Sequence, residues 1–364
     1  MSAEISPSDV PALVDRLLST ALERRASDLH LEPTANGYEA RLRVDGMLSL
    51  AQRHGTAEGR AMVGRLMVLA HLLTYRQDVP QEGRMAWCAL GQTRAIELRL
   101  AIMPTTHGLR AAVRMPAELL GPRTLEELGL PPGVLAGLQQ FAATDAGMLL
   151  LTGPAGSGKT TTIYALLDHI VRRSPGLSIV ALEDPVERDL PGVTQIEVSP
   201  FGQLTYERSL RSILRQDPQV LMLGEIRDRE TAALAIQAAL SGHRLVSALH
   251  AGTPAGAIAR LLEMGLEPYQ ITSALHGVVA QRLLRRRLDG QYHGRVVAAE
   301  FARIDPALRS AILSRADAAQ MTGCLTLQPG YTTMQQVAAE LAAHGQTDAA
   351  EIERVFGAEA RDRR

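Results

Sequence analysis

A glycine-rich stretch in the middle of the chain has the residue types that suit phosphate binding. It consists of Gly153, Pro154, Ala155, Gly156, Ser157, Gly158, Lys159, Thr160 and Thr161. The order fits the pattern G-x-x-x-x-G-K-[ST], whose glycines let the backbone curl until successive N–H groups face phosphate oxygens. The lysine can reach the β and γ phosphates, and Thr160 can ligate Mg²⁺. The stretch therefore predicts a site for ATP with Mg²⁺.

The residues on either side of this stretch suit a strand, a loop and a helix in that order. The apolar run Met148–Thr152 precedes it. After it, apolar residues recur on one helical face, at Ile163, Leu166, Leu167, Ile170 and Val171. A helix that begins here adds its dipole to the attraction for an anion. The alternative, a glycine-rich turn within a core, does not account for this context.

Carboxylates follow two further apolar runs. The run Val220–Leu223 leads into Gly224 and Glu225, and the run Leu177–Leu182 leads into Glu183, Asp184 and Glu187. Behind a phosphate loop, Glu225 is the expected second acidic element, which holds Mg²⁺ through water or polarises the attacking water. Clustered carboxylates also mark a cation or a polarised water, and Glu183 is the better candidate because it directly follows its run. The structural alternatives are a solvated strand end and an acidic turn.

Two histidines bracket a fourth apolar run, Leu245–Leu249. His243 precedes this run and His250 follows it, so His250 falls at the carboxyl end of the expected strand. From there it could donate a hydrogen bond to the γ phosphate or to a neighbouring carboxylate. A structural role remains open for both, and metal ligation is disfavoured because no third ligand lies close in the sequence.

Three arginines in the first third of the chain could stabilise phosphoryl transfer. Arg41 and Arg43 are two residues apart and share one face of their expected strand, and Arg84 follows Gln81-Glu82-Gly83. A guanidinium placed against a γ phosphate stabilises the charge that develops there. The alternative is a solvated strand face.

Composition limits the class of protein. The chain has 364 residues, enough for two or three domains, and its net charge of −1 gives no indication of nucleic acid or an anionic membrane. Its two cysteines, Cys88 and Cys324, fit a reducing compartment and exclude a cysteine-ligated zinc site. The first 22 residues do not resemble a signal peptide, and no run is apolar enough to span a membrane. We therefore expect a cytoplasmic protein that contacts membranes only through partners.

The first part of the chain predicts an α+β domain over residues 1–117. Apolar spacing from Val14 to Leu22 indicates a helix, and a second helix is expected over Gly59–Leu73. Strands are expected at Asp28–Glu32, Glu39–Val44, Ile96–Ile102 and Leu109–Val113, with turns at Asn36-Gly37 and Asp45-Gly46. Gly121-Pro122 indicates a linker over residues 118–124.

From residue 125 to 364 the sequence predicts a parallel sheet with crossover helices. The four apolar runs described above alternate with long amphipathic segments. Because open α/β sheets bind ligands at the carboxyl ends of their strands, all four could line one nucleotide site. After Ala280 we expect an Arg-rich helical region. The dense basic run Arg282–Arg287 is interpreted there as a helix end or a subunit contact.

Several long motifs in fixed order make the chain similar to the assembly and secretion ATPases of type II secretion and type IV pili. They are Gly153–Thr162, Ala181–Glu187, Leu210–Pro218 running into Gly224–Ala232, and Gly242–His250, together with Ala26–Pro33, Arg43–Gly46 and Pro104–Gly108 in the smaller domain. Gln195–Val198 followed by Leu210–Pro218 resembles the secretion and assembly branch more than the retraction branch. The resemblance runs from about residue 10 to the end of the chain.

This resemblance implies a homo-hexameric ring ATPase of α/β fold. Each subunit would have a PAS-like α+β N-terminal domain and a RecA-like P-loop NTPase domain with a C-terminal helical subdomain, and ATP would lie between the two. Lys159 and Thr160 would hold phosphates and Mg²⁺, Glu225 would be the second acidic element, and Glu183 would help place the water.

The same resemblance assigns arginines of the N-terminal domain to the γ phosphate, Arg43 first and Arg41 and Arg84 after it. The ring would turn an inner-membrane platform protein and so power pilus or pseudopilus assembly or protein secretion. Compared with this family, we expect two departures: no extra N-terminal docking domain, which many assembly and secretion members carry, and no four-cysteine zinc insert near residues 285–295. Ala248 and Ala251-Gly252 replace the usual residues around His250.

Three other functions fit the sequence less well. A type IV secretion-type traffic ATPase is disfavoured by the Glu225–Asp228 stretch and the acidic box. A nucleotide-binding scaffold with little turnover is disfavoured because Lys159, Glu183 and Glu225 are all intact. A nucleic-acid translocase is disfavoured because no basic, aromatic-rich stripe is present and aromatic residues make up only 3% of the chain.

Overall fold

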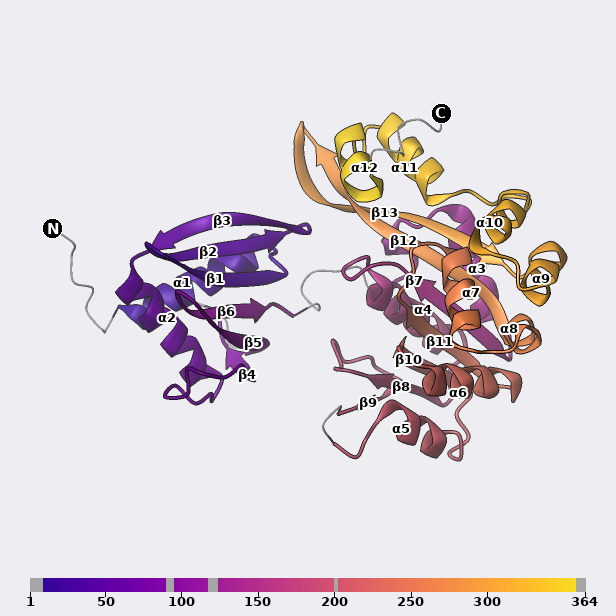
Figure 1. Cartoon of the computed structure of the whole chain (residues 1–364), viewed down its shortest axis with the longest axis horizontal. Helices are drawn as coiled ribbons and strands as arrows, with labels where there is room; N and C mark the ends of the chain where they lie inside the picture. Colours follow the sequence, from indigo (N-terminus) through magenta and orange to yellow (C-terminus); the bar gives the residue numbers. More distant parts are fainter. Residues whose placement is uncertain (1–8, 90–94, 117–123, 200–201, 358–364) are drawn as a thin grey trace. The chain divides into compact units, whose positions relative to one another are not determined.

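The computed structural model describes residues 9–89, 95–116, 124–199 and 202–357. The chain divides into two compact units, Met1–Gly121 and Pro122–Arg364 (Figure 1). Apart from Thr124, the linker expected over residues 118–124 lies outside the described residues.

Unit 1 is an antiparallel sheet of six strands in the order β3-β2-β1-β6-β5-β4. Its elements are α1 (Val10–Glu23), β1 (Asp28–Thr34), β2 (Gly37–Val44), β3 (Met47–His54), α2 (Thr56–Leu69), β4 (Gln81–Trp87), β5 (Ile96–Thr105) and β6 (Gly108–Arg114). The apolar faces of α1 and α2 pack with the sheet's inward side chains into one core, which leaves the alternate positions on the other face polar.

The expectations for unit 1 are confirmed for α1, β1, β2, β5 and β6, and both predicted turns are present. The second helix was predicted one turn too late. It ends at Leu69, because His71 adopts a left-handed φ of 57° and reverses the chain. The edge strands β3 and β4 were not predicted. β3 buries only one of its eight residues, so its sequence shows little alternation.

Unit 2 is built on a seven-stranded sheet in the order β13-β12-β7-β11-β10-β8-β9 (Figure 1). The strands are β7 (Gly147–Thr152), β8 (Ile179–Glu183), β9 (Thr194–Glu197), β10 (Val220–Ile226), β11 (Arg244–Leu249), β12 (Leu275–Leu288) and β13 (Gln291–Arg303). All neighbours are parallel except β12 and β13. The four predicted apolar runs are β7, β8, β10 and β11, and they lie side by side as expected.

Helices cover both faces of this sheet. They are α3 (Pro132–Ala142), α4 (Lys159–Arg173), α5 (Tyr206–Ile213), α6 (Arg229–Leu240), α7 (Pro254–Glu263), α8 (Pro268–Ala274), α9 (Pro306–Leu313), α10 (Ala318–Thr326), α11 (Met334–Ala343) and α12 (Ala349–Phe356), after the short 3₁₀ turn η2 (Glu126–Leu128). Helices α3 and α4 share a core with Leu149 and Leu151, whereas α5–α10 share another with Met148 and Leu150. This alternation along β7 defines a doubly wound α/β layer structure.

The prediction of a helix directly after Ala280 is wrong as far as residue 303, whereas the helices expected at the end of the chain are present as α9–α12. The chain instead forms the long antiparallel hairpin of β12 and β13, so the arginine run lies on a strand. Leucine and arginine favour helices locally, but pairing with β7 and β13 imposes the extended form. Asp289 and Gly290 make the turn, with φ of 49° and 78°. Such an Asp-Gly pair is a hairpin signal.

Among the described helices, none combines the length and the apolar character that crossing a bilayer requires.

Candidate nucleotide-binding site

The glycine-rich loop joins the carboxyl end of β7 to the first turn of α4, as the sequence predicts. Gly153, Gly156 and Gly158 have φ of 149°, 74° and 91°. Side chains rarely adopt such values, so these glycines permit the curl of the loop. A Cβ on Gly153 would lie 2.5 Å from Ser157 Oγ, which leaves no room for any other residue there.

Lys159 lies across this loop. Its Nζ donates to the carbonyl oxygens of Gly153 at 2.8 Å and Pro154 at 3.0 Å. Burial lowers the pKa of the ammonium, and the nearby Glu225 carboxylate opposes that shift. The first N–H groups of α4 have no partners within the helix. The Lys159 ammonium and these backbone donors therefore lie together at the glycine-rich loop.

The loop fits the phosphates of a nucleotide. The hydroxyl of Ser157 is buried and has no hydrogen-bond partner among the described residues. Thr160 and Thr161 are partly exposed at the start of α4. Among the described residues, no group of three or more His, Cys, Asp or Glu side chains could hold a metal by itself. The donor set therefore suits Mg²⁺, which binds one or two protein ligands together with substrate phosphates.

Glu225 lies at the carboxyl end of β10 and contacts two cationic or potentially cationic groups. Its carboxylate accepts hydrogen bonds from Arg227 Nε and, at 2.9 Å, from His250 Nε2. His250 follows β11, which pairs with β10 in parallel, so the two strand ends meet. Arg227 also lies 3.4 Å from Asp184 Oδ2, which joins the end of β8 to this cluster.

The end of β7 is tied to the same edge. The Thr152 hydroxyl donates to Ala251 O and accepts from Ala251 N, both at 2.9 Å. The predicted convergence of the strand ends of β7, β8, β10 and β11 is therefore present within unit 2.

Glu183 occupies a different environment from Glu225. Only 3% of it is exposed, and its carboxylate accepts from the Tyr164 hydroxyl and, at 2.8 Å, from Gln195 Nε2. Burial raises the pKa of this carboxyl. Tyr164 Oη also accepts from Glu187 N at 3.2 Å. Glu183 and Tyr164 thus connect helix α4 to the acidic loop.

His243 lies at the opposite end of β11 from His250. Its Nδ1 is 3.0 Å from Ala238 O, at the end of α6. The structure therefore places His243 away from the glycine-rich loop and gives it a backbone partner.

The three arginines predicted from unit 1 contact carboxylates of their own sheet. Arg41 Nη2 lies 2.6 Å from Glu39, Arg43 Nε lies 3.3 Å from Asp28, and Arg84 Nη1 lies 3.4 Å from Glu97.

Strand register adds two arginines that the sequence did not single out. Arg43 is opposite Asp28, Asp28 is opposite Arg114, Arg114 is opposite Arg99, and Arg99 is opposite Arg84. Directly opposite residues point to the same face of a sheet. We call this set of Arg43, Asp28, Arg114, Arg99 and Arg84 the arginine row. The arginine row lies on the face that α1 and α2 leave uncovered, where Asp28 and Glu97 are carboxylate partners of Arg43 and Arg84.

The sequence also missed the residues that hold the carboxylates: Arg227, Tyr164 and Gln195. Arg227 could have been found, because it stands two residues after Glu225. Tyr164 and Gln195 carried no signal, since their contacts depend on the packing of α4 and β9 around the end of β8.

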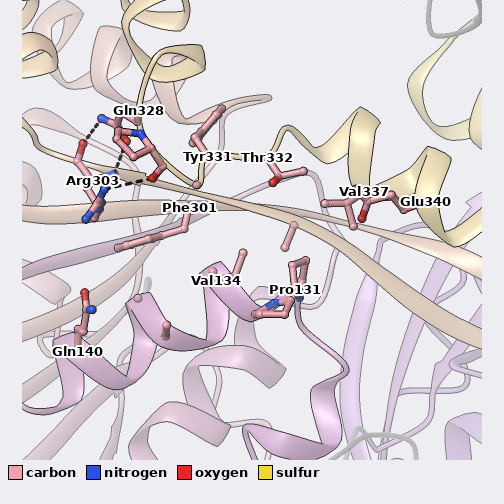
Figure 2. A pocket seen from close by; sticks show the side chains of 17 residues that line it. Pro131, Val134, Gln140, Phe301, Arg303, Gln328, Tyr331, Thr332, Val337 and Glu340 are labelled. Carbon is pink, nitrogen blue, oxygen red and sulfur yellow. Dashed lines mark hydrogen bonds between the residues drawn. The ribbon is translucent and has the colours of Figure 1, made fainter. Parts of the chain in front are cut away.

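A separate cavity of about 410 Å³ lies elsewhere in unit 2 (Figure 2). It is lined by α3, the end of β13 and the segment that leads into α11, with Pro131, Phe301 and Tyr331 among its walls. None of its lining residues belongs to the glycine-rich loop or to the Glu225 cluster.

The sequence and the fold of this chain are similar to those of known proteins. The model of the family described as "Type II/IV secretion system protein" matches residues 4–354. The type II secretion system protein HxcR of Pseudomonas aeruginosa is 43% identical over 274 residues, which cover 75% of this chain and 58% of that protein. The type IV pilus assembly ATPase PilB of Thermus thermophilus is 38% identical over 283 residues, or 78% of this chain and 31% of PilB.

A solved structure, that of the pilus retraction motor PilT with bound ADP, is 26% identical. It matches with a TM-score of 0.67 over 95% of this chain and 96% of PilT. The chain thus spans little more than half of HxcR and about a third of PilB, but nearly all of the structure of PilT. Since the family model covers almost the whole sequence, the chain belongs to the type II/IV secretion system protein family.

Proposed function

We propose that this chain is an ATP-hydrolysing hexameric motor. It powers pilus or pseudopilus assembly, or protein secretion, through an inner-membrane platform protein. One observation carries the proposal. Lys159 on the glycine-rich loop interacts electrostatically with the Glu225 carboxylate at the end of β10, and His250 at the end of the adjacent β11 forms a hydrogen bond with that carboxylate. A phosphate-binding loop with a carboxylate beside it is the arrangement that hydrolysis of a γ phosphate requires.

The residues of the loop take the binding roles. The N–H groups of Gly156, Gly158 and Lys159 and the Lys159 ammonium hold the β and γ phosphates. Mg²⁺, when bound through Thr160 and Glu225, neutralises charge that develops on the phosphates. Gly153, Pro154, Ser157 and Thr161 shape the loop around these groups.

Glu225 orients and polarises the attacking water in this proposal, and His250 fixes the carboxylate. Glu183 acts less directly, because hydrogen bonds engage both of its oxygens. It holds the acidic loop, and through Asp184 and Arg227 this loop reaches Glu225. Glu225 therefore polarises the water, and Glu183 keeps the acidic loop in place.

The arginine row supplies the remaining positive charge. Arg84 lies directly opposite Arg99, and Arg99 lies directly opposite Arg114, so three guanidinium groups stand side by side on one face of the sheet. We propose that Arg43, Arg84, Arg99 and Arg114, with Arg41 beside them, stabilise the γ phosphate during transfer. Unit 1 then corresponds to a PAS-like domain over residues 1–117, joined by the linker 118–124 to a RecA-like domain over residues 125–364.

The platform protein keeps the motor at the cytoplasmic side of the inner membrane. The names of HxcR and PilB support secretion or pilus assembly, and not pilus retraction, as the process that the motor drives.

The proposal predicts that Mg²⁺-ATP turnover per subunit rises with protein concentration, because a hexamer completes the site. Glu225→Gln should lower kcat by at least about a hundredfold while ADP still binds. Steady-state assays across protein concentrations, with binding measured by calorimetry, test both statements. ADP binding without turnover at every concentration would instead favour a nucleotide-binding scaffold.

A further inference from the structure

Gln281 on β12 contacts the glycine-rich loop and helix α4 at the same time. Its Nε2 donates to Ser157 O at 2.7 Å, and its Oε1 accepts from Thr162 Oγ1 at 3.1 Å. Both Gln281 and Thr162 are buried, with 1% and 2% exposed. One side chain of β12 thus contacts both parts of the phosphate-binding unit, the loop and helix α4.

The physics of the loop explains why such a contact matters. A loop that turns its N–H groups inward toward phosphates must turn carbonyl groups outward, away from the ligand. A buried carbonyl without a partner costs about 1–3 kcal/mol. Gln281 supplies the donor for Ser157 O, so the outward orientation of that carbonyl is held in place by the strand beside the loop.

The glycines of the loop are fitted to the same residue. A Cβ on Gly158 would lie 3.0 Å from Gln281 Nε2, and a Cβ on Gly153 would lie 2.6 Å from Gln281 O. Two of the glycines therefore serve a second purpose besides their φ values. They let the loop rest directly on the backbone and amide of Gln281.

We infer that Gln281 is a positioning residue for nucleotide binding: it fixes the peptide at Ser157 so that the loop is shaped for phosphate before any nucleotide arrives. This inference rests on the proposed function, because it assumes that the loop binds ADP and ATP. Gln281 itself has no place in phosphoryl transfer. Its effect should therefore appear in the affinity for the nucleotide.

The substitution Gln281→Glu gives a readout that a merely structural role would not produce. The ionised carboxylate can accept from Thr162, but it has no proton for Ser157 O and would face that oxygen directly. When protonated it can donate again. Burial raises the pKa of such a carboxyl, so protonation should occur between about pH 6 and pH 8.

We expect the variant to bind Mg²⁺-ADP about tenfold more weakly than wild type at about pH 8 and to approach wild type at about pH 6. Gln281→Leu should bind weakly across the whole range. Among the charged side chains nearby, Arg282 donates to Gln281 O at 3.1 Å, Glu300 acts electrostatically on Arg282, and Lys159 follows Gly158 in the loop. These charges are common to wild type and variant. The wild-type profile therefore gives their contribution, and calorimetry at each pH measures the affinities.

Gln328 offers a matched control. It is also a buried glutamine of unit 2, and its amide bridges the backbone of Arg303, donating to Arg303 O at 2.7 Å and accepting from Arg303 N (Figure 2). Gln328→Glu makes the same chemical change beside the separate cavity. Gln328→Glu should lower the melting temperature about as much as Gln281→Glu does, but it should cause no pH-dependent change in ADP affinity.

Two outcomes would separate the inference from the proposed function. If wild type binds ADP and Gln281→Glu binds it equally well from about pH 6 to about pH 8, the inference is wrong and the proposed function stands. If wild type itself does not bind ADP, the proposed function fails first. Should Gln281→Leu not fold, Gln281→Met takes its place as the variant without a donor for Ser157 O, and unchanged ADP affinity there would overturn the inference.

Discussion

Glu183 and Glu225 end neighbouring strands, yet their surroundings differ. Glu183 is buried and accepts hydrogen bonds from a tyrosine and an amide. Glu225 is 19% exposed and accepts from Arg227 and His250. Burial raises the pKa of Glu183, whereas Glu225 is more exposed and lies beside two potentially cationic groups. The carboxylate suited to polarising a water is therefore Glu225.

Tyr164→Phe should destabilise the protein by about 1–3 kcal/mol, because it removes a donor from the buried Glu183 and an acceptor from Glu187 N. Burial already raises the pKa of Glu183, and loss of the Tyr164 bond should raise it further. A carboxyl with a raised folded-state pKa stabilises the fold at low pH and loses that contribution as pH rises through the folded-state pKa. The variant's deficit should thus grow with pH.

Urea unfolding at several pH values measures this deficit. Tyr269→Phe is the control, because Tyr269 is 60% exposed and its loss should change the free energy of unfolding by less than about 0.5 kcal/mol. Equal effects of the two substitutions would show that Tyr164 does not support Glu183.

At the scale of elements, the hairpin of β12 and β13 gives the basic run Arg282–Arg287 a structural role. From the sequence alone, this run is interpreted as a helix end or a subunit contact. Glu351 on α12 is fully buried and accepts from Arg285 N at 2.9 Å, Arg285 Nε at 2.8 Å and Arg354 Nε at 2.7 Å. Arg287 lies 3.2 Å from Asp348 at the start of the same helix. These arginines hold the C-terminal helices on the ribbon of β12 and β13.

Glu351→Gln should loosen α12, because it leaves Arg285 and Arg354 without their carboxylate. Loss of one partner of a buried ion pair costs about 3–5 kcal/mol. Hydrogen exchange of residues 349–356 should become much faster, while the exchange of β7 stays unchanged. Glu340→Gln, an exposed change on α11, should leave both unaffected.

Acid should have the same effect as this substitution. Burial alone would raise the pKa of Glu351, but hydrogen bonds from Arg354 and Arg285 lower it to about 2. A lowered folded-state pKa gives stability above the unfolded-state value of 4.5 that is lost as pH falls toward 2. Protection of α12 that persists at the acid end of this range would contradict the assignment.

Prediction from sequence succeeded where a local motif or the general rule for parallel sheets applies, and failed where a feature depends on the exact register of paired strands. The run before the glycine-rich loop could only be a strand, because the loop and an amphipathic helix follow it. The convergence of Glu225 and His250 followed from parallel strands whose carboxyl ends share one edge. In contrast, the arginine row depends on the register of five strands, and the ribbon from Arg282 to Leu288 is extended only because β13 pairs with it.

At the scale of the molecule, the two units have separate hydrophobic cores. The core of unit 1 draws on residues between Val14 and Met115, and the cores of unit 2 draw on residues from Leu125 onward. We therefore expect two thermal transitions in calorimetry of the whole chain. Only the transition of unit 2, which carries the loop, should respond strongly to Mg²⁺-ADP.

A ligand that binds only the folded state adds about 2.7 kcal/mol at a concentration of a hundred times its Kd. Mg²⁺-ADP at that level should raise the melting temperature of one transition, and Lys159→Ala should abolish the shift. A single transition, or equal shifts of two, would mean that the units unfold together.

Strand β12 has a mechanical consequence. Its first half pairs with β7 inside the sheet, and its second half carries α11 and α12 as part of the two-stranded ribbon (Figure 1). From residue 281 to residue 288 the strand extends about 23 Å. Gln281 lies at the start of this extension and contacts the glycine-rich loop, and the C-terminal helices pack farther along it. A single strand therefore connects the loop to the C-terminal helices over this distance, with one shift of register between Arg285 and Arg287.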